Sequence, residues 1–103
     1  MPHPEAATRA IVLSSQDNVA TILTGAAIGL GLGYEGGVVT CVEDVPPGHK
    51  IALVSIRQGT EIIKFGVPIG SATRDIGPGE HVHVHNVKSN YTPTWIAEQC
   101  VAI

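Results

Sequence analysis

The chain has 103 residues, which is enough for one domain with a modest core and too few for a two-domain enzyme. Hydrophobic residues make up 44% of the sequence and charged residues 15%, a globular balance that argues against intrinsic disorder. The formal net charge is only −3, and the six Lys and Arg residues form no basic stripe. This charge pattern disfavours a nucleic-acid partner.

The N-terminal residues 1–9 contain no basic region followed by a hydrophobic stretch, so we expect an extension here rather than a secretory signal. The most apolar segment, residues 19–32, is shorter than the roughly 20 residues that a membrane span needs. Cys41 and Cys100 fit neither zinc-finger spacing nor a disulfide scaffold. We therefore expect a cytoplasmic protein without membrane contact, in which Cys41 is a buried, inert thiol.

Short runs of β-branched residues, separated by twelve glycines and seven prolines, predict an all-β domain with brief strands and tight Pro/Gly turns. We expect this domain over residues 10–90, followed by a C-terminal tail over residues 91–103. Strands are expected at Ala10–Leu13, Val38–Val42, Lys50–Ser55, Glu61–Phe65, Ile69–Ala72 and Glu80–Val87. A weak helical periodicity occurs near Val19–Leu23, and the glycine-rich residues 29–37 predict a flexible hairpin-like loop.

A short pattern recurs three times, with an apolar residue three positions before a glycine and another three positions after it. The copies are Val45–Ile51, Ile56–Ile62 and Ile76–Val82. Two of them contain Pro-Gly pairs, which suit a type II turn because Pro fixes φ and Gly accepts positive φ. Each of these two turns is followed closely by a histidine, His49 or His81.

Residues 79–86 read Gly-Glu-His-Val-His-Val-His-Asn. In an extended strand, His81, His83 and His85 share one face, and imidazole is the commonest metal ligand and the side chain that titrates nearest neutrality. Neighbouring positions on one face lie about 6.6 Å apart, so two of these histidines can share an ion whose other ligands come from elsewhere. The alternative is a solvated or interface face that binds nothing.

Four separated motifs carry a family resemblance: Asp17-Asn18-Val19, Gly48–Leu53, Ile63–Gly70 and Gly79–Asn86. With them the chain resembles the N-terminal domain of the altronate dehydratase family of sugar-acid dehydratases, a SAF-type domain of β-clip fold. In that family the domain precedes a large catalytic domain or forms a separate small subunit, as in sulfolactate sulfo-lyase. The resemblance therefore implies a large catalytic partner, supplied by another polypeptide or by the rest of a longer chain.

The resemblance also implies a reaction, in which an aldonate loses water to give a 2-keto-3-deoxy acid with divalent iron or manganese as cofactor. His81, His83 and His85 are then the leading metal-ligand or acid/base candidates, and His49 is a further catalytic candidate for the metal or a proton. The candidates for substrate binding are Lys50, Lys64 and Asn86. Their alternatives are a solvated turn for His49 and Lys50, and an exposed strand position for Lys64.

Asp17 and Asn18 fit a turn or cap whose side-chain oxygens accept backbone N–H groups, and a role in the site is the less favoured reading. The tail, which contains Trp95, packs on the domain or docks on a large subunit; we favour docking.

Two functions follow from these observations. In the first, the chain completes the active site of a larger dehydratase chain and is inactive alone. In the second, it is a stand-alone sugar-acid binding module without catalysis. The sequence leaves open which sugar acid or sulfonated acid is the substrate, which metal is bound, and whether the chain forms a homo-oligomer.

Overall fold

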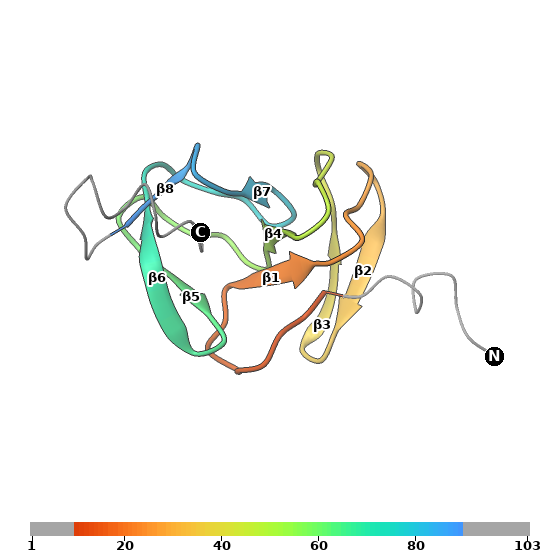
Figure 1. The fold of residues 1–103 in the computed structure, drawn as a ribbon, viewed down its shortest axis with the longest axis horizontal. Coiled ribbons are helices and arrows are strands. Elements are labelled where there is room, and N and C mark those ends of the chain that lie inside the picture. Colours follow the sequence, from red (N-terminus) through yellow and green to blue (C-terminus); the bar gives the residue numbers. More distant parts are fainter. Residues whose placement is uncertain (1–9, 90–103) are drawn as a thin grey trace.

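Figure 1 shows the computed structural model of the chain, which describes residues 10–89. This part contains eight strands in three small antiparallel sheets and no helix, which confirms the all-β prediction. No helix long and apolar enough to cross a membrane occurs among these residues. The strands are β1 (Val19–Ile22), β2 (Gly31–Tyr34), β3 (Gly37–Thr40), β4 (His49–Ala52), β5 (Glu61–Lys64), β6 (Val67–Ala72), β7 (His81–Val82) and β8 (Val87–Lys88).

The sheet β1-β4-β7 lies between the hairpin β2-β3 and the sheet β5-β6-β8 (Figure 1). Each of its faces packs on a separate hydrophobic cluster. Because neighbouring residues in a strand point to opposite faces, Ile51 of β4 joins the cluster with β2 and β3, whereas Ala52 joins the cluster with β5 and β6. By the same alternation, His49 lies on the face of Ile51, and Lys50 lies on the face of Ala52.

The chain builds the same unit twice around the central sheet. In the first unit the hairpin β2-β3 is closed by a bridge between Ala26 and Val45, and in the second the hairpin β5-β6 is closed by a bridge between Ile56 and Ile76. An aspartate holds each closure in the same way: Asp44 accepts the N–H of Ile28 at 2.8 Å, and Asp75 accepts that of Gln58 at 2.8 Å. The two units deliver β4 and β7 to the same sheet.

The Pro-Gly turns lie at the ends of these two units, as the sequence predicts. Gly48 has φ of +80° and Gly79 has φ of +83°, values that favour glycine. A backbone hydrogen bond closes each turn, from His49 to Pro46 and from Glu80 to Gly77. Each turn leads directly into a strand whose start carries a histidine.

Several predicted strands are confirmed with shifted ends, namely those at 38–42, 50–55, 61–65 and 69–72. The helical reading of Val19–Leu23 is wrong, because these residues form β1, which pairs with β4 along its whole length. The loop over residues 29–37 is wrong in part, because Gly31–Tyr34 form β2. The predicted strand Ala10–Leu13 does not form, and within it only Ile11 makes a β-bridge, to Thr21.

The predicted strand Glu80–Val87 is also wrong, because β7 ends at Val82 and the chain turns before β8 begins. Cys41 is buried as expected, at 1% exposure, and burial raises the pKa of its thiol. The N-terminal extension and the tail, with Trp95 and Cys100, lie outside the described residues.

Candidate functional site

Three of the histidines come together on one face of the central sheet. His49 begins β4, His81 begins β7 and His83 follows β7 directly. The strands β4 and β7 are antiparallel with Ile51 opposite His81, a register that brings the start of β4 beside the end of β7. One ring nitrogen from each of the three histidines lies within 4.8 Å of the others, and all three side chains are half-buried. We call these residues the histidine triad.

The rings of the triad are in close contact. The Nδ1 atom of His49 lies 2.8 Å from the Nε2 atom of His81, so one of these nitrogens donates a hydrogen to the other. The rings of His49 and His83 are stacked with centroids 4.1 Å apart. His85 is exposed, and its ring centroid lies 5.1 Å from that of His81. Because the strand ends at Val82, His85 does not continue the predicted stripe and lies outside the triad.

The side chain of Asn86 fixes the backbone that carries His81 and His83. Its Nδ2 donates to the carbonyl of His81 at 2.9 Å, and its Oδ1 accepts the N–H of His83 at 3.0 Å. Its own N–H closes the turn by donating to the carbonyl of His83 at 3.1 Å. Asn86 is fully buried. The structure thus shows a backbone bridge at this residue, and the substrate contact that the sequence suggests stays a prediction.

Glu43 contacts the backbone of the triad, although no pattern in the sequence singles it out. Its Oε2 accepts the N–H of His81 at 3.0 Å, and its charge raises the pKa of His81 against the other influences. The contact arises because Val42 donates its N–H to the carbonyl of Gly79, which places the segment after β3 against the turn before β7. No local sequence pattern signals a contact between residues so far apart.

Burial is the main influence on the pKa of His81, and it lowers that pKa from its ordinary value. The neighbouring histidines His85, His49 and His83 lower it further because protonated rings repel one another. A lowered pKa keeps the imidazole neutral near pH 7. Only a neutral imidazole can bind a metal ion or accept a proton.

The structure does not bring Lys50 and Lys64 together with the triad. Lys50 lies on the opposite face of the central sheet, as its place between His49 and Ile51 requires. It is buried, at 5% exposure, and its pKa is lowered by burial and by the charge of Lys64. The two lysines therefore belong to a second polar region.

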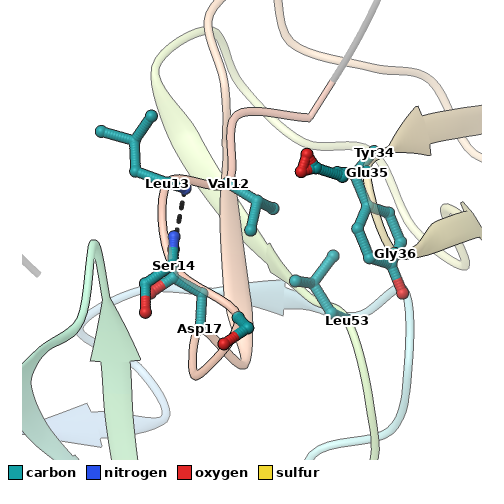
Figure 2. Close-up of a pocket in the computed structure, with 9 residues that line it drawn as sticks. Val12, Leu13, Ser14, Asp17, Tyr34, Glu35, Gly36 and Leu53 are labelled. Carbon is teal, nitrogen blue, oxygen red and sulfur yellow. Dashed lines mark hydrogen bonds between the residues drawn. The ribbon is translucent and has the colours of Figure 1, made fainter.

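A cavity of about 260 Å³ lies between the segment before β1 and the hairpin β2-β3, and no histidine lines it. Figure 2 shows Val12, Leu53 and the ring of Tyr34 around this space. Asp17 lies on its rim, where its carboxylate accepts the N–H groups of Leu13, Ser14 and Gly66. Asp17 thus has the turn role that the sequence predicts, because its carboxylate already accepts these three backbone N–H groups.

Comparison with known families bears out the resemblance. Residues 8–90 match the family described as the altronate/galactarate dehydratase SAF domain. The chain belongs to this family. The match includes the whole histidine triad, both lysines and both repeated units.

Individual relatives include full enzymes and separate small subunits. The altronate dehydratase of Bacillus subtilis is 45% identical over 80 residues, which are 78% of this chain and 16% of that enzyme. The (2R)-sulfolactate sulfo-lyase subunit alpha of Chromohalobacter salexigens is 47% identical over 45 residues, which are 44% of this chain and 48% of that subunit. The corresponding subunit from Paracoccus pantotrophus is 41% identical over 51 residues, which are 50% of this chain and 76% of that subunit. This SAF domain thus spans about one sixth of the altronate dehydratase it matches.

Proposed function

We propose that this SAF domain works with a larger catalytic chain as part of a sugar-acid dehydratase, and that the histidine triad contributes to the shared active site. The main support is the convergence of three imidazoles from two separate segments within 4.8 Å. A second support is the 45% identity to an altronate dehydratase that is much longer than this chain. The domain alone offers few acidic groups near the triad, so we expect it to be inactive by itself.

The triad fits a divalent metal ion. Two nitrogens that bind one ion through bonds of about 2.1 Å lie roughly 3.4 Å apart at tetrahedral angles. The 2.8 Å between the His49 and His81 nitrogens is shorter than this separation and the 4.8 Å limit of the triad is longer, so the rings shift when they bind one ion. We propose Fe(II) or Mn(II), with the remaining oxygen ligands supplied by the substrate and the larger chain. Such an ion stabilises the negative charge that develops next to the substrate carboxylate.

Dehydration removes the proton on C2 and the hydroxyl on C3 as water, and the resulting enol tautomerises to the 2-keto acid. A base must take the first proton, and an acid must protonate the departing hydroxyl. A triad imidazole whose nitrogen binds the ion cannot also accept this proton, so the base is a group outside the triad, and His85 is the candidate in this chain. His85 is exposed beside His81 and is suited to exchange that proton with solvent.

The test is reconstitution of this chain with a large altronate dehydratase-like chain that lacks its own SAF domain. We expect the mixture to convert altronate to a 2-keto-3-deoxy acid, and each protein alone to be inactive. Replacement His83→Ala should abolish the restored activity while the two chains still associate in gel filtration. Full activity of the His83→Ala mixture would refute the role of the triad.

A further inference from the structure

Lys50 occupies a position that is unusual for a lysine. It lies in β4, the central strand of the central sheet, directly between Thr21 of β1 and Val82 of β7. Only 5% of its surface is exposed. Lysines are rarely buried to this extent unless an acidic group pairs with them.

No such acidic group is present in residues 10–89, where the side chain of Lys50 makes neither a hydrogen bond nor an ion pair. The charged group that acts on it is another cation, Lys64 of β5. Lys64 is half-buried, and its Nζ lies 5.3 Å from the ring centroid of Phe65. Lys50 is thus buried, feels a like charge from Lys64, and has no counter-ion among the described residues, which is unfavourable for the isolated fold.

The sheet register shows which way this region faces. Directly opposite residues in a sheet point to the same side, so Thr21, Lys50 and Val82 share one face. Val82 belongs to the hydrophobic cluster with β5 and β6, which places Lys50 on the side of Lys64 and away from the triad. The hydroxyl of Thr21 adds a hydrogen-bond donor on the same face.

We propose that Lys50, Lys64 and Thr21 form a binding site for the carboxylate of a hydroxy acid, on the opposite face of the central sheet from the histidine triad. A carboxylate accepts charge-assisted hydrogen bonds from both ammonium groups and supplies the missing negative charge. This is a second site, separate from the reacting carboxylate beside the triad. The identity of its ligand as a sugar acid rests on the proposed function, but the site itself needs neither a metal ion nor the triad. A carboxylate side chain of the larger chain has the same chemistry, and the experiment separates these two sources.

The test uses the full 103-residue chain in the presence of a chelator, with binding measured by calorimetry and by amide NMR shifts. The ligands are altronate and altritol, the polyol with the same six carbons and no carboxylate. We expect altronate to bind and to shift the amides of β1, β4 and β5, and altritol not to bind. Lys50→Met should weaken altronate binding by about tenfold or more. Lys88→Met, which alters an exposed lysine in β8, should leave binding unchanged.

Thermal unfolding distinguishes a ligand-binding lysine from one that only stabilises the fold. Methionine keeps the buried stem of Lys50 and removes the unpaired charge, so Lys50→Met should raise the Tm of the free protein. Altronate should raise the Tm of the parent chain but not that of the variant. A lower Tm for Lys50→Met, or equal binding of altronate and altritol, would overturn the proposal. Failure of altronate to bind, together with weaker association of Lys50→Met with the larger chain, would assign Lys50 to a partner carboxylate instead.

These outcomes are separate from those of the proposed function. Loss of the triad through His83→Ala should leave metal-free altronate binding intact, because His83 lies on the other face of the sheet. If the reconstituted mixture showed no dehydratase activity but altronate still bound to the chain, the chain would be a sugar-acid binding module.

Discussion

The Nδ1 atom of His49 lies 2.8 Å from the Nε2 atom of His81, although the two histidines are 32 positions apart in the sequence. At this distance one of the two nitrogens carries a hydrogen and donates it to the other, which must be unprotonated. A metal ion that displaces this hydrogen meets two nitrogens already directed toward one point, with His83 stacked beside them. The pairing of β4 with β7 creates this arrangement.

We predict that the metal-free chain binds one Co(II) ion, a spectroscopic probe for divalent metal sites, through the triad. His83→Ala should weaken binding by about 100-fold, because a three-nitrogen site loses one ligand. His85→Ala is the matched control, since it removes a neighbouring imidazole outside the triad, and it should change the affinity less than threefold. The measurement is a titration followed by the visible absorption of Co(II). Equal losses in the two variants would show that the triad is not the ligand set.

A second prediction concerns the backbone bridge made by Asn86. Asn86→Asp replaces the donor that faces the carbonyl of His81 with an oxygen, so a hydrogen bond becomes a repulsion in a fully buried position. We expect the free energy of unfolding to fall by about 2–3 kcal/mol and Co(II) affinity to fall by at least about tenfold. Urea unfolding and the Co(II) titration measure the two effects.

Asn18 is the control for this prediction, because it makes the same bridge elsewhere. Its Nδ2 donates to the carbonyl of Glu61 at 2.8 Å, and its Oδ1 accepts the N–H of Ile63 at 2.7 Å. Asn18→Asp should destabilise the fold as well, with little effect on Co(II) affinity. If Asn18→Asp weakened Co(II) binding as much as Asn86→Asp, the effect would come from lost stability alone.

The low pKa of His81 predicts how stability depends on pH in the metal-free protein. The unfolded chain takes up a proton at His81 near the ordinary value of 6.5, whereas the folded protein takes it up only at lower pH. The unfolded state therefore binds more protons between these values. Stability should be highest above pH 7 and fall as the pH drops below about 6.5 toward the folded pKa.

Urea unfolding at pH 7.5, 6.5 and 5.5 with a chelator measures this dependence. His81→Gln should flatten the curve, because glutamine does not titrate. A stability that rises as the pH falls from 7.5 to 5.5 would contradict the assigned direction of the shift.

The sequence is sufficient for the all-β class and the Pro-Gly turns, since these follow from local residue chemistry. The strand β1 escapes prediction because it is buried on both faces, so Val19, Ala20 and Ile22 show no alternation of apolar and polar residues. Apolar residues spaced in this way fit a helix equally well. Only the pairing with β4 decides between the two.

The candidate site is predictable in its residue types and less so in its geometry. The spacing of the histidines limits the strand to two ligands for one ion, and the structure has His81 and His83 from this segment with His49 from another. The end of β7 is not visible in the alternating pattern, because it depends on how the side chain of Asn86 bonds to the backbone. The contact of Glu43 with His81 cannot be predicted from local sequence, because the two residues are 38 positions apart and only the fold brings them together.

The two repeated turns supply a last prediction, in which similar glycines respond differently. Gly48 and Gly79 both have positive φ, so an alanine at either position costs about 1 kcal/mol in backbone strain. A Cβ at Gly48 meets nothing within 4 Å, whereas a Cβ at Gly79 collides with the carbonyl oxygen of Thr40. We therefore expect Gly48→Ala to lower the free energy of unfolding by about 1 kcal/mol and Gly79→Ala to lower it by about 3 kcal/mol or more.

The same pair of variants tests how the site is built. The turn at Gly79 packs on the end of β3 and leads into His81, so the backbone shift that relieves the collision also moves one member of the triad. Gly79→Ala should therefore weaken Co(II) binding, measured under conditions where the variant is folded. Gly48→Ala should bind Co(II) nearly as tightly as the parent chain, because the open space around Gly48 requires no shift of His49. Equal Co(II) affinities for both variants would mean that the triad tolerates movement of its own turn.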